Sequence, residues 1–401
     1  MKNVILFTID TLRKDVLGCY GNQNKLTPFI DSLQDKCIKF TNAQSTGPYT
    51  QASFPGLLTS SYYLEYGRQK KCSPKRTLIS EVLKKSGITT AGFHSNPYLC
   101  GYFGWDRGWD VFYDSMQDEV SDKIPYIKGD GINHKVDQWL STHIKDNNYR
   151  PFFLWTHYMD VHEPYIPARE YLNKVDPSIN LFEDEMLDLF KEIILKRDIS
   201  DQKTVKLLKK LYDAGVRETD DYVKNFFKIL EKYGVLKDSV VIITTDHGDE
   251  FGEHGSLSHD GKMYAELINS PLLICYYNYT QEVCDNLVSN IDISPTILYL
   301  FGLEPLEAFK GHSFLPLKNY PQKGVFGEAI GKTSNQEKET DQPIYFYREK
   351  DLKIIYQESD QSWEMYNLNK DPQELNNLIN ISDKSKDMKK KIMSQIKQIT
   401  I

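Results

Sequence analysis

The feature that most constrains this chain is a short apolar run, rich in β-branched residues, that ends at a polar side chain. The run occurs four times: residues 4–9 precede Asp10, residues 88–93 precede His94, residues 152–156 precede His157, and residues 240–245 precede Asp246. Such runs are typical of strands that are buried on both faces of a parallel sheet. Sheets of this kind bind ligands beyond the carboxyl ends of their strands, so these polar residues are the first candidates for a site.

Helical patterns lie between these runs. Residues 77–85 show one, and residues 205–233 show a longer amphipathic pattern with apolar residues at helical spacing. Gly234 follows the longer pattern, and glycine commonly ends a helix. Strands that alternate with helices predict an α/β fold, in which a mostly parallel central sheet carries helices on both faces.

The length of 401 residues suits one large domain with a small addition. We expect an α/β domain over residues 1–316 and a small C-terminal α+β subdomain over residues 317–401. The sequence of the second part predicts a polar loop, two hairpin strands and a terminal helix, at residues 331–342, 344–347, 352–356 and 382–397.

Composition and charge exclude several classes of protein. The net charge of -7 comes from intermixed acids and bases, and no basic stripe is present to bind nucleic acid. No apolar stretch reaches the roughly 20 residues that span a bilayer, and Met1-Lys2-Asn3 leads directly into the first predicted strand without a signal region. We therefore expect a cytoplasmic protein with no nucleic-acid or membrane partner. The six scattered cysteines are expected to be mostly reduced and structural.

Asp246 and His247 stand side by side at the end of a predicted strand, within a segment rich in glycine and acids. A carboxylate and an imidazole in this position suit a divalent cation, and the glycines allow close approach of the backbone. A capped turn into a helix is the alternative interpretation, because such turns also favour Asp and Gly. Asp10 supplies a second carboxylate from another part of the sheet.

Arg13 lies three residues beyond Asp10. Its planar fork of donors suits an oxyanion of the substrate or a buried carboxylate. The sequence leaves two interpretations open: contact with substrate, or a structural ion pair with Asp15 or another acid.

The chain resembles the sulfatase-like members of the alkaline phosphatase superfamily. The resemblance extends over nearly the whole chain and is carried by Asp10, Cys19-Tyr20-Gly21, Ser95-Asn96-Pro97, Gly108-Trp109-Asp110, His162-Glu163-Pro164-Tyr165, Tyr264-Ala265-Glu266, Asp292-Ile293-Ser294-Pro295-Thr296 and Asp371-Pro372. It implies an alkaline-phosphatase-like α/β fold and the metal-dependent hydrolysis of sulfate or phosphate esters.

The resemblance places the nucleophile at Thr50, at the start of a stretch that continues to Leu57-Leu58-Thr59. The family commonly has a Cys or Ser here, which is converted to formylglycine. This chain departs from the family pattern because Ala52 replaces the usual Pro and Phe54 replaces the usual Arg. An esterified threonine cannot collapse to an aldehyde, so water must clear the adduct. In the alternative interpretation, Thr50 only caps a helix and the site has lost catalysis.

The resemblance also implies a metal site and its surroundings. One divalent cation, whether Ca²⁺, Mn²⁺ or Zn²⁺, would be held by Asp10, Thr50, Asp246 and His247. His162 and His259 would be catalytic, either one as general acid. Contacts to the substrate are expected from Arg13, Asn96, His157 and Lys262. A second metal, as in alkaline phosphatase, would draw on Asp160, His162 and His259, but a single metal is the favoured expectation.

The sequence therefore predicts a metal-dependent hydrolase of sulfate or phosphate or phosphonate esters, with a small molecule or carbohydrate ester as its partner. Transfer of the group to a glycan or alcohol acceptor is one alternative. A relative without catalysis that binds an anionic glycan is another, for which Phe54 is the best support. A homo-oligomer is compatible with the sequence.

Overall fold

A computed structural model describes residues 3–68, 71–116, 118–121, 123–145, 150–321, 323–331 and 338–399. Its largest element is an eight-stranded sheet in the order β10-β2-β9-β6-β1-β5-β3-β4. The strands are β1 (Asn3–Ile9), β2 (Cys37–Gln44), β3 (Thr89–His94), β4 (Val111–Tyr113), β5 (Phe152–Tyr158), β6 (Ser239–Thr245), β9 (Asn269–Tyr276) and β10 (Glu282–Ser289). The four apolar runs of the sequence are thus four neighbouring strands: β6, β1, β5 and β3.

Strand β1 lies at the centre because its side chains are apolar on both faces. Ile5 and Phe7 pack into the core on one side of the sheet, and Val4 and Leu6 pack into the core on the other. β1 pairs in parallel with both β5 and β6, and Ile9 lies opposite residues of each. Because the three strands end in register, the residues that follow them meet at one edge of the sheet.

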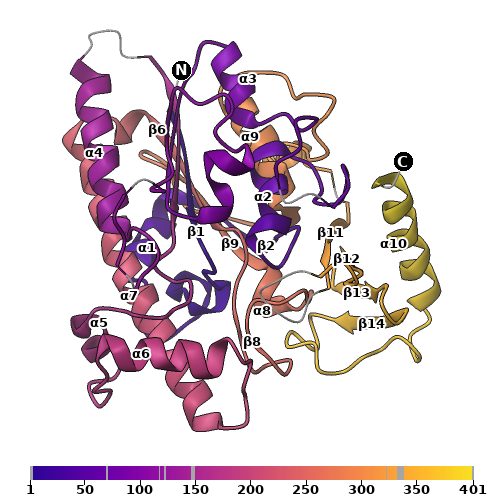
Figure 1. Cartoon of the computed structure of the whole chain (residues 1–401). Coiled ribbons are helices and arrows are strands. Elements are labelled where there is room, and N and C mark those ends of the chain that lie inside the picture. The colour runs from indigo at the N-terminus through magenta and orange to yellow at the C-terminus, as the bar shows by residue number, and fades with distance from the viewer. Residues whose placement is uncertain are drawn as a thin grey trace.

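Helices cover both faces of this sheet, as Figure 1 shows. One face carries α1 (Pro28–Leu33), α4 (Gly129–Lys145) and the long α7 (Gln202–Lys232), and α2 (Thr50–Thr59), α3 (Ile79–Lys85) and α9 (Ile293–Leu300) cover the other. Gly234 has φ 68°, a left-handed conformation that suits a residue without a side chain just beyond the end of α7. The predicted α/β architecture is confirmed.

Shorter elements surround the carboxyl edge of the sheet. They are the hairpin of β7 (Glu250–Phe251) and β8 (Leu257–Ser258), the helices α5 (Arg169–Val175), α6 (Glu183–Leu189) and α8 (Ala265–Ile268), and a π-helical turn, Phe190–Ile194. The hairpin follows β6 directly and reaches over the edge where β1 ends.

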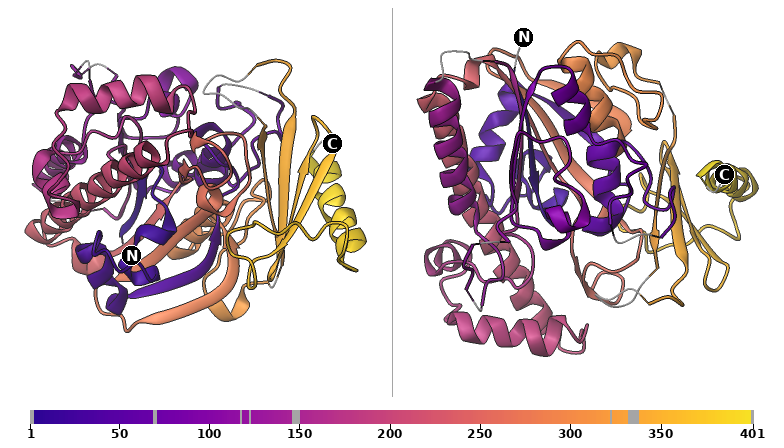
Figure 2. Two further views of the ribbon diagram at one scale, coloured as in Figure 1. Left: turned by 90° about the horizontal axis from the view of Figure 1, so that it is seen from below. Right: turned by 45° about the horizontal axis from the view of Figure 1, so that its top comes forward.

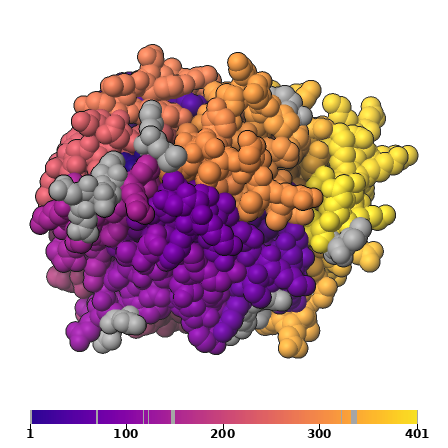
Figure 3. Space-filling view, turned by 90° about the horizontal axis from the view of Figure 1, so that it is seen from above, coloured from indigo at the N-terminus to yellow at the C-terminus, as the bar shows by residue number. Residues whose placement is uncertain are grey.

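A second sheet stands beside the large one and is antiparallel, in the order β11-β12-β13-β14. Its strands are β11 (Val325–Ile330), β12 (Pro343–Glu349), β13 (Leu352–Gln357) and β14 (Ser362–Asn367), and α10 (Ser385–Ile399) packs on its outer face. Figure 2 shows the small sheet between the main body and α10, and Figure 3 shows the C-terminal segment in yellow at one end of the molecule. The predicted hairpin strands and terminal helix are confirmed. The predicted loop lies partly outside the described residues, and the domain boundary at residue 316 stays a prediction.

Two cysteines depart from the expectation of reduced thiols. Cys37 of β2 and Cys275 of β9 lie opposite each other in the sheet and form a disulfide. Cys19, Cys72, Cys100 and Cys284 are free and buried. The pairing was missed because the register of two strands far apart in sequence cannot be deduced from cysteine spacing. Within the described residues, no helix is both long and apolar enough to cross a membrane.

Candidate active site

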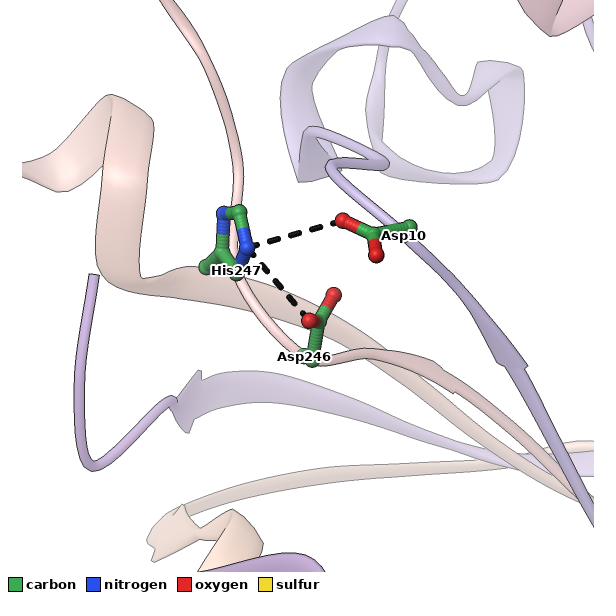
Figure 4. A group of neighbouring side chains, drawn as sticks. All are labelled: Asp10, Asp246 and His247. Carbon is green, nitrogen blue, oxygen red and sulfur yellow. Dashed lines mark ion pairs between the residues drawn. The ribbon is translucent and has the colours of Figure 1, made fainter. Parts of the chain in front are cut away.

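Two strand ends bring together the acids and the histidine that the sequence singled out (Figure 4). Ile9 lies opposite Thr245, so Asp10 and Asp246 leave β1 and β6 at the same level. The Nε2 atom of His247 lies 3.5 Å from Asp10 Oδ1 and 3.4 Å from Asp246 Oδ2. All three side chains are fully buried.

Asp10 is held by one of its two oxygens. Its Oδ2 accepts hydrogen bonds from Asn96 Nδ2 at 2.8 Å and from His157 Nε2 at 3.1 Å. Thr8 supports this arrangement, because its hydroxyl lies 2.9 Å from His157 Nδ1 and leaves the Nε2 proton for the carboxylate. Asp10 Oδ1 has no hydrogen-bond partner among the described residues and lies on the side of His247. Asn96 and His157 therefore orient the carboxylate.

His247 and Asp246 complete a group suited to a cation. His247 Nδ1 donates to the carbonyl oxygen of Gly248 at 3.0 Å, which leaves the lone pair of Nε2 on the side of the two carboxylates. Neither carboxylate oxygen of Asp246 has a hydrogen-bond partner in the described part of the chain. A buried carboxylate without hydrogen-bond partners lowers the stability of the fold. One ligand atom from each of Asp10, Asp246 and His247 lies within 4.8 Å of the other two. These residues fit a divalent cation.

The charges of this group act on its own protonation. Burial, together with the negative charge of Asp10, raises the pKa of Asp246 to about 8. Burial alone would also raise the pKa of Asp10, but the hydrogen bond from His157 and the nearby histidine charges hold it below its usual range. At Asp246, burial and the repulsion from Asp10 therefore outweigh the nearby histidine charge.

Thr50 is the first residue of α2, which follows Tyr49 in extended conformation. Its hydroxyl lies 3.5 Å from His247 Nε2 and 3.4 Å from Asn96 Nδ2. The N-terminus of a helix favours negative charge, which would develop on a group attached to this hydroxyl. Phe54 is fully buried, and its ring lies 5.1 Å from the ring of His157. The residue that replaces the usual Arg therefore packs beneath the site.

Thr50 opens into a cleft of about 390 Å³. His162 and His259 line this cleft, with ring centroids 5.0 Å apart, and His259 lies 4.6 Å from the ring of His247. Burial alone would lower the pKa of His162, but the charges of Asp10, Glu163 and Asp249 raise it to about 9. His162 is therefore cationic at neutral pH and suits an anionic ligand. Leu187, Phe190 and Lys191 also line this cleft.

Two of the predicted substrate contacts, Arg13 and Lys262, have partners within the chain. Arg13 forms ion pairs with Asp15 at 2.7 Å and Glu253 at 2.6 Å, which is the structural alternative that the sequence left open. Lys262 Nζ donates to Glu250 at 2.8 Å.

Asp160 also faces away from the predicted second metal. Both of its carboxylate oxygens accept from the backbone N–H of Gly129, at the start of α4. Instead, Glu163, Asp249 and His259 form a second group whose ligand atoms lie within 4.8 Å of one another. Sequence reasoning missed Asp249, although its place two residues after His247 was a signal for it.

Acids, imidazoles and a hydroxyl gathered at the carboxyl edge of a parallel sheet suit an ester hydrolase. Comparison of sequences agrees with this class. The profile described as Sulfatase matches residues 2–303, and the profile described as N-sulphoglucosamine sulphohydrolase, C-terminal, matches residues 252–401. The chain belongs to the sulfatase family, and this makes it an enzyme of the sulfuric ester hydrolase class.

Individual relatives cover most of the chain. An arylsulfatase of Clostridium perfringens is 24% identical over 446 residues, which is 94% of this chain and 90% of the relative. The uncharacterized sulfatase YidJ of Escherichia coli is 25% identical over 425 residues, 94% of this chain and 83% of that protein. The similarity is thus to whole enzymes.

Solved structures share the fold at lower identity. A phosphonate monoester hydrolase of Agrobacterium radiobacter superposes with a TM-score of 0.80 at 17% identity, covering 100% of this chain and 96% of the other. A protein solved with its substrate D-glucosamine-2-N,6-O-disulfate superposes with a TM-score of 0.79 at 19% identity, covering 99% and 97%. These likenesses confirm the alkaline-phosphatase-like fold that the sequence predicted.

Proposed function

We propose that the protein hydrolyses sulfate or phosphonate esters with Thr50 as nucleophile, beside one divalent cation bound by Asp10, Asp246, His247 and the Thr50 oxygen. The observation that carries this proposal is a set of three buried carboxylate oxygens, one on Asp10 and two on Asp246, that have no hydrogen-bond partner among the described residues and lie close to the hydroxyl at the start of α2. A cation or protons must offset the charge of these oxygens. A cation held here would lie next to the Thr50 hydroxyl and could activate it.

The reaction follows from the positions of the side chains. A cation bound at these ligands would lower the pKa of the Thr50 hydroxyl and offset charge on the transferring group. Thr50 loses its proton to water in the cleft, and its oxygen forms a bond to sulfur or phosphorus while the bond to the leaving oxygen breaks. His162 or His259 gives the leaving oxygen a proton. Water then attacks the adduct, and the Thr50 oxygen leaves and regains its proton.

The ligand set favours Mn²⁺ or Zn²⁺ over Ca²⁺. Ca²⁺ prefers six to eight oxygen ligands, whereas this site offers an imidazole nitrogen together with two carboxylates and a hydroxyl. His247 is held in the tautomer that a metal requires by the carbonyl of Gly248.

The choice between sulfate and phosphonate rests on Thr50. A threonine adduct must be cleared by water, which makes no use of the aldehyde route that formylglycine offers to sulfate. The fold is shared with a phosphonate monoester hydrolase as well as with a protein whose substrate is a sulfated glucosamine. We therefore include phosphonate monoesters beside sulfate esters as substrates.

A substrate panel tests the proposal. Metal-depleted wild type, refilled with Mn²⁺ or Zn²⁺, is assayed on an aryl sulfate, a phosphate monoester, a phosphate diester and a phosphonate monoester. We expect turnover of at least one ester, loss of turnover in Thr50→Ala, and partial retention in Thr50→Ser, which keeps the hydroxyl. Full activity of Thr50→Ala would contradict the covalent step. Tight binding of the esters without turnover would favour the non-catalytic alternative.

A further inference from the structure

The hairpin that follows the metal site carries a second set of buried polar side chains. Glu250 and Ser258 pair across the hairpin of β7 and β8. Asp249 precedes the first strand and His259 follows the second, so the two face each other at the open end. The Nδ1 atom of His259 lies 2.8 Å from Asp249 Oδ1. The hairpin thus delivers an imidazole and a carboxylate as a hydrogen-bonded pair.

The other oxygen of Asp249 is also occupied. Tyr165, from the loop after β5, donates its hydroxyl to Asp249 Oδ2 at 2.7 Å. Asp249 is fully buried and Tyr165 is 4% exposed, so neither bond competes with bulk water. The carboxylate is fixed from two sides and in turn fixes the ring of His259. Tyr165 and Asp249 do not line the cleft, whereas His259 does.

The orientation of His259 follows from this chain of hydrogen bonds. The bond between His259 Nδ1 and Asp249 Oδ1 contains one proton, and with Asp249 ionised that proton is on Nδ1. Nε2 lies on the opposite edge of the ring, in a side chain that shares the cleft with Thr50 and His162. A buried acid that holds the far nitrogen of a histidine fixes its tautomer and stabilises the imidazolium.

We propose that Asp249 and Tyr165 are positioning residues that hold His259 as the proton donor to the leaving oxygen, and that the site serves esters of alcohols whose alkoxides are poor leaving groups. This inference rests on the proposed function. Donation of a proton matters most when the leaving oxygen is strongly basic, as in an alkyl or sugar alcohol. A phenolate with electron-withdrawing groups leaves without such help.

The proton balance closes over one cycle. The Thr50 hydroxyl gives its proton to water, the Thr50 oxygen forms a bond to the sulfur or phosphorus atom, the bond to the leaving oxygen breaks, and His259 Nε2 transfers its proton to that oxygen. The alcohol departs and His259 is neutral. The attacking water then gives a proton to His259 Nε2, its oxygen forms a bond to sulfur or phosphorus, and the bond to Thr50 breaks. His259 is again protonated and Thr50 regains a proton from water.

A second cation at Glu163, Asp249 and His259 is the competing use of these residues. Glu163 is 5% exposed, and its Oε2 has no hydrogen-bond partner in the described part of the chain. The separation of 2.8 Å between His259 Nδ1 and Asp249 Oδ1 is that of a charge-assisted hydrogen bond, and a protonated nitrogen has no lone pair for a metal. The geometry therefore favours the proton donor.

Two esters that share the transferred group and differ in the alcohol test this proposal. One is a 4-nitrophenyl ester and the other is an alkyl ester. Both carry the same transferred group, sulfate or phosphonate, that the wild-type enzyme accepts. We expect Asp249→Asn to lower kcat for the alkyl ester about 100-fold, and kcat for the nitrophenyl ester only a few fold, with KM little changed. Tyr165→Phe, which removes one supporting bond, should show the same selectivity with a smaller loss.

Asp220→Asn is the matched control. Asp220 is buried and accepts from the backbone of Phe29 and Ile30, on α1. Its loss should change both esters by the same factor. An equal loss on both esters in Asp249→Asn and Tyr165→Phe would overturn the inference. So would a metal content that falls from two equivalents in wild type to one in Asp249→Asn. Failure of the proposed function would differ, since wild type itself would then lack metal-dependent turnover.

Discussion

The buried carboxylates of Glu374, beside the small sheet, and Asp246, at the edge of the large sheet, have neighbours of opposite charge. Glu374, beside the small sheet, pairs with Lys353 of β13 at 2.7 Å and accepts from the backbone of Ala265 at 2.6 Å, and both charged side chains are 1% exposed. Asp246, at the edge of the large sheet, is as deeply buried, but the acid Asp10 is its neighbour and its oxygens have no hydrogen-bond partner in the described residues. The buried acid thus has a lysine as its charged partner in the first region and another acid as its neighbour in the second.

This difference separates a structural acid from a functional one. Burial raises the pKa of Glu374 and lowers the pKa of Lys353, so desolvation offsets much of the attraction within their pair. The two opposite charges lie 2.7 Å apart and need no added ion for balance, although Lys353 Nζ and Glu374 Oε1 have no hydrogen-bond partner of good geometry in the described residues. Under the proposed function, a bound cation would offset the charge of Asp10 and Asp246, and the metal-free protein would be less stable for lack of it.

Replacement of Lys353 should have the largest effect on the free energy of unfolding. Lys353→Met leaves Glu374 buried without its partner, and we expect a loss of about 3–5 kcal/mol in the free energy of unfolding. Denaturation by urea measures it. The double variant Lys353→Met with Glu374→Leu should recover most of the loss, because the uncompensated charge is gone. A loss below about 1 kcal/mol in the single variant would show that Glu374 does not depend on Lys353.

At the proposed metal site, replacement of the buried acid is expected to stabilise the metal-free protein. In metal-free protein above pH 8, where Asp246 is ionised, Asp246→Asn removes a buried charge next to Asp10 and supplies a donor to it, so we expect a gain of about 1 kcal/mol in the free energy of unfolding. In the presence of Mn²⁺ or Zn²⁺ the order should reverse, because wild type gains the binding energy of the ion. Thermal unfolding with and without metal measures both. Destabilisation of the metal-free variant would contradict the account.

The smallest effect is expected at an exposed ion pair of the same small sheet. Lys391 of α10 pairs with Glu349 of β12 at 2.6 Å, and the side chains are 35% and 39% exposed. Solvent screens this pair, so Lys391→Ala should cost less than about 1 kcal/mol in urea denaturation. A cost equal to that of Lys353→Met would show that burial is not what separates the two pairs.

The sequence predicted the parts of the site that follow strands. Asp10 and Asp246 were found because each ends a buried apolar run, and parallel strands place their carboxyl ends together. The directions of long or loop-borne side chains were not predictable. Arg13 turns to Asp15 and Glu253, and Asp160 turns to the start of α4, because each finds a local partner that only the folded chain brings near.

Contacts between residues on different strands could not be predicted from the sequence either. The disulfide of Cys37 and Cys275 depends on the register of β2 and β9, which are separated by 238 residues in sequence. The bond between Asp249 and His259 depends on where the β7–β8 hairpin turns. Periodicity and composition report burial, and they do not report which distant residue lies opposite.

An anomalous X-ray scattering map of crystals grown with Zn²⁺ would test the metal site most directly. The account predicts a strong peak about 2.0–2.2 Å from Asp10 Oδ1, an Asp246 oxygen and His247 Nε2 in wild type, and no such peak in Asp246→Asn. Wild-type crystals without density for an ion between these three side chains would contradict it.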